Sequence, residues 1–150
     1  EDIANWKTYR NEEYGFEIKY PKTLSINEAL IYNRVSLHTT VKDYQVPFVE
    51  IHILEGSIQN LYDEALIRLS RIDPSAIKKR DIIISGKLAK DIYLVTPEPP
   101  NPDYPPDLLM GYEYHEIYLE AKTGNTIFIK SVDLDPIYLE KILSTFKFIN

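Results

Sequence analysis

The sequence predicts an α+β fold, with a central, mostly antiparallel sheet and helices on both faces, arranged as an α/β/α sandwich. Apolar and polar residues alternate along several stretches of strand length. The links between these stretches are short and polar or contain glycine, which is typical of antiparallel hairpins. The runs IIIS and TIFI are apolar on both faces, so we expect helices to cover both sides of the sheet.

The first strong strand prediction lies within NEEYGFEIKYPK, residues 11–22. Its apolar face consists of Tyr14, Phe16, Ile18 and Tyr20. Gly15 suits a turn that needs positive φ, and Pro21 removes a backbone donor and ends the strand. Trp6 and Tyr9 predict a short strand before this turn. We therefore interpret the stretch as an entry strand of the core and not as a functional site.

The middle of the chain predicts four strands and one helix. The strands are expected at 34–40, 47–55, 80–85 and 89–96. Between the second and third strands, apolar residues recur at helical spacing over residues 58–72. Ser57 is placed to cap the start of this helix, and Asp73 followed by Pro74 ends it.

The C-terminal third predicts a hairpin and a final helix. Strands at 111–121 and 125–132 flank a glycine-containing turn. Asp135 and Pro136 supply an N-cap and a first-turn proline for the helix. Before the hairpin, residues 97–107 hold six of the ten prolines, which predicts a long, stiff, exposed loop.

Composition excludes several classes of function for this chain of 150 residues, which we expect to be a single domain over residues 1–150. A net charge of −6 disfavours nucleic acid as a partner, because a phosphate-binding surface is basic. No apolar run is long enough for a transmembrane helix, and the absence of cysteine excludes disulfides and thiol catalysis. The chain begins with Glu1 and not Met, so we expect that a leader or a non-native N-terminal segment has been removed and that residues 1–5 are the remnant of a flexible tether.

Two stretches carry a resemblance to a known family. WKTY at 6–9, followed by NEEYGFEIKYP at 11–21, resembles the start of many uncharacterised bacterial lipoproteins and secreted proteins of PsbP-like type. ILSTFKF at 142–148 resembles their C-terminal signature, and the resemblance covers essentially the whole chain. It implies the α/β/α sandwich shared by PsbP, an extrinsic lumenal protein of photosystem II, and by a eukaryotic Ran-binding family.

The resemblance also implies a kind of function and a location. Members are mostly binding or assembly proteins, although a shared fold does not by itself transfer a function. The implied location is outside the cytoplasm of a bacterium, either secreted or tethered by a lipid anchor upstream of residue 1. We therefore expect a non-enzymatic binding or assembly module that uses no cofactor and has an unidentified protein as its partner.

A different interpretation is a hydrolase on the polar face of the strands at 34–40 and 47–55. The candidate residues there are Ser36, His38, Glu50 and His52. In one possible register, His38 lies opposite Glu50 and Ser36 lies near His52. His38, Glu50 and His52 would then be ligands for zinc or a similar ion, or a serine, a histidine and a glutamate would form a triad. The structural interpretation of the same residues is a solvated or hydrogen-bonded sheet face.

Tyrosines in the strand at 111–121 form another candidate surface. Tyr112, Tyr114 and Tyr118 share a face with Glu116. Such aromatic rows bind sugars or peptides, and they also form the apolar face of a strand under a helix. His115 points the other way, and a histidine on an apolar face is expected to be packed and hydrogen-bonded.

The proline loop is the remaining candidate site. The residues expected to contact a protein partner are Pro99, Pro100, Tyr104 and Pro105. A stiff, exposed segment loses little entropy when a partner holds it. The alternative is a connection between strands that is kept rigid against proteolysis. A third function, as a cytosolic adaptor for a GTPase, rests on fold analogy alone.

Overall fold

The computed structural model describes residues 2–29, 32–41, 44–71, 74–95, 109–121 and 124–149. The helical elements are the short 3₁₀ helix η1 (Ile3–Asn5) and the helices α1 (Ile58–Ser70) and α2 (Pro136–Ser144). The strands are β1 (Lys7–Asn11), β2 (Phe16–Tyr20), β3 (Ser25–Ala29), β4 (Arg34–Val41), β5 (Tyr44–Leu54), β6 (Ile77–Ile84), β7 (Lys87–Val95), β8 (Leu109–Glu120), β9 (Thr126–Leu134) and β10 (Lys147–Phe148).

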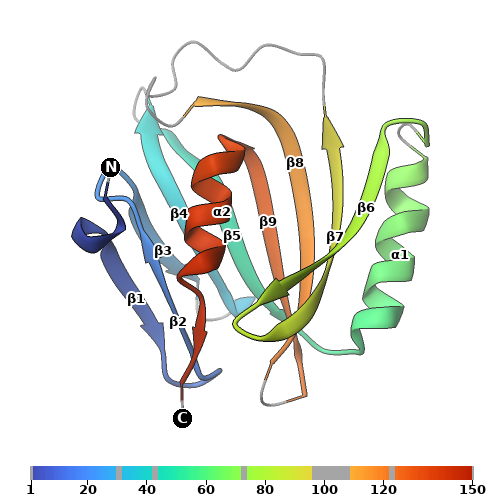
Figure 1. The fold of residues 1–150 in the computed structure, drawn as a ribbon, viewed down its shortest axis with the longest axis horizontal. Coiled ribbons are helices and arrows are strands. Elements are labelled where there is room, and N and C mark those ends of the chain that lie inside the picture. Colours follow the sequence, from blue (N-terminus) through green and yellow to red (C-terminus); the bar gives the residue numbers. More distant parts are fainter. Residues whose placement is uncertain are drawn as a thin grey trace.

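In the described part of the chain, the strands form two sheets (Figure 1). The large sheet has seven strands in the order β3-β4-β5-β9-β8-β7-β6, and the small sheet has the order β1-β2-β10. Every pair of neighbouring strands runs antiparallel. The predicted α+β class and the mostly antiparallel sheet are therefore confirmed.

The two helices pack against different residues of the same strand, β8. Ala65 and Leu69 of α1 form an apolar cluster with Tyr118. Leu139 and Ile142 of α2 belong to a larger cluster that contains Ile117 and Leu119. Alternate residues of a strand point to opposite faces. The larger cluster also includes residues of β1 and β2. The small sheet therefore covers this face of the large sheet together with α2, whereas the sequence predicted a cover of helices alone (Figure 1).

Two strands were not predicted, and both lack a sequence signal of their own. β3 has the sequence SINEA, is mostly exposed and lies at the edge of the large sheet. Its alternation is weak because no buried face selects apolar residues at every second position. β10 consists of two residues that pair with Glu17 and Phe16 of β2, so it depends on a partner distant in sequence.

The predicted entry strand is confirmed with one difference. Phe16, Ile18 and Tyr20 are buried in β2, whereas Tyr14 lies in the preceding turn and is only partly buried. Gly15 has φ +69° in this turn, which is the conformation that glycine tolerates best. The stretch is therefore a structural element of the core, as the sequence indicates.

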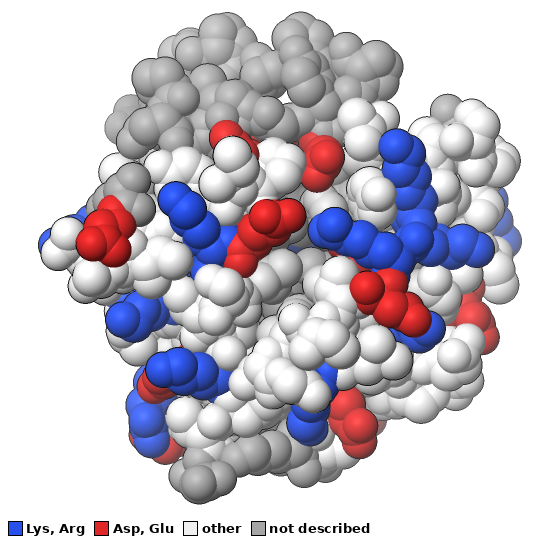
Figure 2. All heavy atoms as spheres, viewed as in Figure 1, with Lys and Arg blue, Asp and Glu red and all other residues white. Residues whose placement is uncertain are grey.

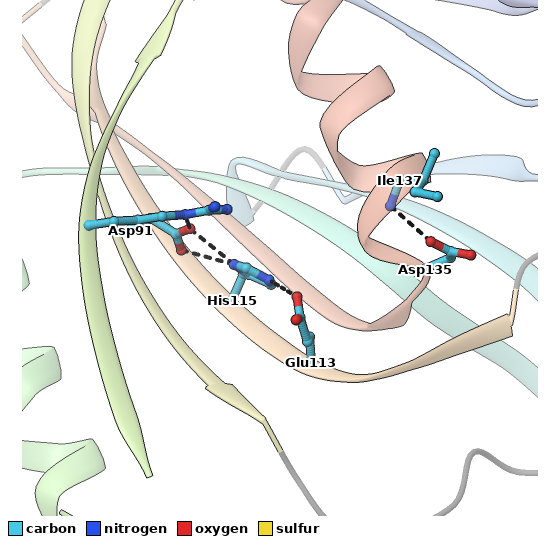
Figure 3. Close-up of polar contacts among 6 residues, drawn as sticks. Asp91, Glu113, His115, Asp135 and Ile137 are labelled. Atoms are coloured by element: carbon cyan, nitrogen blue, oxygen red, sulfur yellow. Dashed lines mark hydrogen bonds and ion pairs between the residues drawn. The ribbon is translucent and has the colours of Figure 1, made fainter. Parts of the chain in front are cut away.

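The predicted helix caps are also present. The Ser57 side chain accepts a hydrogen bond from the backbone N–H of Asn60, at 3.2 Å. Asp135 Oδ1 accepts from the N–H of Ile137 at 2.8 Å, at the start of α2 (Figure 3).

Neither described helix has the length and apolar run needed to cross a membrane. On the face viewed in Figure 1, the acidic and basic side chains of the described residues are interspersed (Figure 2).

Candidate functional site

Two neighbouring rows of side chains cross the large sheet on the face that α1 partly covers. The register of β5, β9 and β8 aligns His52, Phe128 and Tyr118 in one row, which we call the aromatic row. The same register aligns Glu50, Lys130 and Glu116 in the next row, which we call the ionic row. Directly opposed residues in antiparallel strands lie close enough for their side chains to interact. An apolar strip and a charged strip therefore lie side by side.

These rows form the floor of a cavity, and α1 forms one wall. The cavity has a volume of about 480 Å³, and we call it the groove. Leu61, Glu64, Ala65 and Arg68 line it from α1, and Arg34 lines it from β4. Ligand sites of small molecules usually have volumes of about 300–1,000 Å³. The groove is therefore large enough to hold a small ligand.

Glu116 is held tightly at the α1 side of the groove. Its side chain is 2% exposed, and both carboxylate oxygens accept from Arg68 Nη2 at 2.7 Å. The hydroxyls of Tyr114 and Tyr118 donate to the same carboxylate at 2.6 and 3.1 Å. Burial, reinforced by the charge of Glu116 and the hydrogen bonds to it, raises the pKa of both tyrosines, so they stay neutral donors. Glu116 thus has a complete set of partners.

Glu50 has looser contacts in the middle of the groove. Arg34 Nη1, Lys130 Nζ and His52 Nε2 lie 3.5, 3.7 and 3.9 Å from its oxygens. Charge-assisted hydrogen bonds are usually about 2.7–2.9 Å long, so these contacts are longer than direct bonds. The Glu50 side chain is 15% exposed. The carboxylate of Glu50 and the cations around it are therefore held by longer contacts than the groups around Glu116.

His52 lies beside Glu50 in the groove. Its Nε2 is buried and has no hydrogen-bond partner among the described residues. Burial lowers the pKa of His52; the charge of Glu50 opposes the shift, and the charges of Arg34 and Lys130 add to it. Its ring lies 5.4 Å from that of Phe128, measured between centroids. The imidazole therefore lines the groove as an aromatic surface, while its buried Nε2 lies 3.9 Å from Glu50 Oε2.

The register predicted for the hydrolase residues is wrong. Ser36 pairs with Glu50, Arg34 pairs with His52, and a β-bulge between Leu37 and His38 places His38 opposite Pro47. A bulge inserts an extra residue into one strand and changes the side on which the following residues lie. His38 is buried, and neither His38 nor Ser36 lines the groove. Glu50 and His52 are the members of the predicted set that lie together there.

The predicted metal site at His38, Glu50 and His52 is not assembled by this register. Among the residues that the structure describes, no group of three or more His, Cys, Asp or Glu side chains is arranged to hold a metal ion. The partner site at Pro99, Pro100, Tyr104 and Pro105 lies outside the described residues. It stays a prediction.

The predicted face of tyrosines on β8 contributes directly to the groove. Tyr114, Glu116 and Tyr118 all line it, as their common face indicates, while the side chain of Tyr112 lies outside the described part. Sequence reasoning missed Arg68, Phe128 and Lys130. The alternation in NTIFIK places Phe128 and Lys130 on one face, and the short turn before β9 could have aligned that face with Tyr118 and Glu116.

On the other face, His115 is buried and hydrogen-bonded, as predicted. Its Nδ1 lies 3.0 Å from Asp91 Oδ1, and its Nε2 lies 2.9 Å from Glu113 Oε2 (Figure 3). Asp91 also accepts from Arg80 Nε at 2.8 Å. Burial opposes the charged form of His115, but the hydrogen bonds and charges of Asp91 and Glu113 outweigh it and raise the pKa. His115 therefore joins three strands through a buried charge network.

Comparison with known proteins bears on the fold. No family model and no curated protein matches the sequence. Among solved structures, the chain is similar to cyanobacterial PsbP (CyanoP) from Synechocystis sp. PCC 6803, solved in solution. The match has a TM-score of 0.51 and covers 98% of this chain and 94% of that chain. The fold is PsbP-like. At 10% identity, the likeness concerns the fold and transfers no ligand, partner or site residue.

Proposed function

We propose that the chain is a non-enzymatic binding or assembly module whose ligand site is the groove between α1 and the large sheet. The observation that carries this proposal is the pair of rows on its floor. A partly accessible aromatic strip lies beside loosely paired charges at Glu50, Arg34 and Lys130. Recognition sites commonly combine apolar surface with a few convergent polar groups.

The fold supports the same kind of function without specifying it. The PsbP-like fold agrees with the resemblance of the sequence, and that resemblance implies a family made up mostly of binding or assembly proteins. We infer that residues 1–150 act as one domain with α1 and α2 as opposite covers of an α/β/α sandwich. The side chains of β8 support this layering. Tyr118 packs with α1, whereas its neighbours Ile117 and Leu119 pack with α2.

A fragment screen tests the assignment of the groove. We expect that small-molecule fragments added to ¹⁵N-labelled protein will shift amide signals of β5, β9 and α1 around Glu50, Lys130 and Arg68. The reason is that these residues line the groove. The fragments should bind more weakly to Lys130→Met. They should bind with unchanged affinity to Lys141→Met, which removes a cation from α2. Fragments that shift only residues of α2 and the small sheet, or no hits at all, would contradict the proposal.

We propose further that the protein works outside the cytoplasm, secreted or held by a lipid anchor upstream of residue 1. The support is the resemblance of residues 6–21 and 142–148 to bacterial lipoproteins and secreted proteins. The test is fractionation of cells that express the natural gene from its own start. Recovery in the extracytoplasmic or membrane fraction is expected, and recovery in the cytosol would overturn this part of the proposal.

A further inference from the structure

The charges of the groove are distributed unevenly between its surface and its interior. The side chains of Arg68, Arg34 and Lys130 are 54, 41 and 35% exposed. The carboxylates that they contact are less exposed, at 2% for Glu116 and 15% for Glu50. Glu64, on α1, is the exposed carboxylate among the lining residues. The accessible surface of the groove is therefore cationic, although the whole chain carries a net charge of −6.

Two of these cations contact Glu50 only over long distances, so an external anion can compete for them. Arg34 and Lys130 approach Glu50 only to 3.5 and 3.7 Å, beyond the length of a direct charge-assisted hydrogen bond. Arg68, in contrast, donates at 2.7 Å to Glu116 and fixes α1 to the sheet. An anion entering the groove could accept hydrogen bonds from Arg34 and Lys130 without breaking a short bond in the protein. Both side chains contact the same carboxylate, so their cationic groups converge.

An aromatic surface lies next to these cations. His52 is directly opposite Arg34 in the sheet, and Phe128 is two residues from Lys130 along β9. Neither ring is fully buried, and Leu54 and Leu61 line the groove beside them. Planar rings stack favourably on such surfaces. A ligand that places a ring on His52 and Phe128 would bring an attached anionic group towards Arg34 and Lys130.

We propose that the groove binds a small aromatic carboxylate, with its ring on His52 and Phe128 and its carboxylate on Arg34 and Lys130. This inference rests on the proposed function, since it specifies the ligand of the same groove. A carboxylate matches the converging cations, and the ring matches the aromatic row. The volume of about 480 Å³ suits a ligand of one or two rings.

The test titrates three probes into the ¹⁵N-labelled protein at neutral pH. Benzoate carries both features, cyclohexanecarboxylate keeps the charge without the aromatic ring, and benzamide keeps the ring without the charge. We expect benzoate to shift signals around Glu50, Phe128 and Lys130. Cyclohexanecarboxylate should bind about 2- to 10-fold more weakly, through loss of stacking. Benzamide should bind about 10-fold more weakly or worse, through loss of bonds to charged groups.

Matched variants locate the interaction. Arg34→Gln and Lys130→Met should each weaken benzoate binding by about tenfold. Lys141→Met on α2 should leave it unchanged, because Lys141 contacts Tyr138 and does not line the groove. Equal affinity for benzoate and cyclohexanecarboxylate, or no effect of either groove variant, would overturn the inference. If benzoate does not bind while other fragments occupy the groove, this inference fails and the proposed function stands; if nothing binds there, both fail.

Discussion

Arg68 on α1 donates from Nη2 to both carboxylate oxygens of Glu116 on β8, at 2.7 Å each. This ion pair joins the helix that forms one wall of the groove to the sheet that forms its floor. The hydroxyls of Tyr114 and Tyr118 complete the set of donors around Glu116. A buried carboxylate with these partners is stable only as long as they remain in place. The shape of the groove therefore depends on this contact.

Removing Arg68 should destabilise the protein. In Arg68→Met, the Glu116 carboxylate stays buried and keeps its two tyrosine donors but loses its ion pair with Arg68. Because the Arg68 side chain is half-exposed and water replaces part of the lost contact, we expect a loss of about 1–3 kcal/mol in the free energy of unfolding. Urea unfolding monitored by circular dichroism measures it.

A control for this variant lies on the same helix. Arg71→Gln removes a cation from the exposed end of α1 and should change stability by no more than about 0.5 kcal/mol. If the two variants lose the same stability, the ion pair between Arg68 and Glu116 contributes nothing specific, and α1 is not held to the sheet by this contact.

His115 should make stability depend on pH above about 6.5. Burial opposes its charged form, but Asp91 and Glu113 raise the pKa overall. A raised pKa in the folded state means that the stabilisation is fully present below the unfolded value of about 6.5, and is lost as the pH rises through the folded value. Unfolding curves across this range should show the decline, and His115→Gln should flatten it. A profile that rises over the same range in the parent would contradict the charged His115.

His52 should have the opposite effect, in a different pH window. Burial lowers its pKa, so the folded protein binds a proton less readily than the unfolded chain. Its contribution is present above about pH 6.5 and is lost as the pH falls through the lowered folded value. We expect His52→Gln to reduce the loss of stability on the acidic side of pH 6.5. An unchanged acid limb in this variant would show that the imidazole is not buried in its neutral form.

The cap of α2 offers a test of the fold that does not involve either histidine. Asp135→Ala removes the acceptor for the N–H of Ile137 and should cost about 1 kcal/mol in the free energy of unfolding. Asp135→Asn keeps an acceptor oxygen at the cap and should retain most of the stability. Equal losses in the two variants would show that the cap hydrogen bond is not what stabilises the start of α2.

The sequence predicted those parts of the fold whose signals are local. Alternation located β2 and the β8–β9 hairpin, helical periodicity located α1, and Asp135 located the start of α2. β3 and β10 were not predicted, because an exposed edge strand and a two-residue strand need no alternation of apolar and polar residues. The register shift leaves Phe48 of β5 as the extra residue between the pairs Leu37–Val49 and His38–Pro47. Pro47 is a local signal for such a bulge, but it does not show how far the register moves.

The groove was predictable only in part. Glu50, His52 and the β8 tyrosines were identified as candidates on separate strands, but nothing in one strand shows which neighbour lies beside it. β9 sits between β5 and β8, so the register places Lys130 between Glu50 and Glu116 across three strands. Arg68 reaches the same site from a helix 48 residues away in sequence. Such a site depends on sheet order and helix packing, which no local pattern encodes.

A crystal structure of the protein with saturating benzoate would show whether the groove holds an aromatic carboxylate. We expect the benzoate ring on His52 and Phe128 in the groove, with its carboxylate about 2.7–3.0 Å from donors of both Arg34 and Lys130. Benzoate bound elsewhere on the molecule, with the groove empty, would contradict the account.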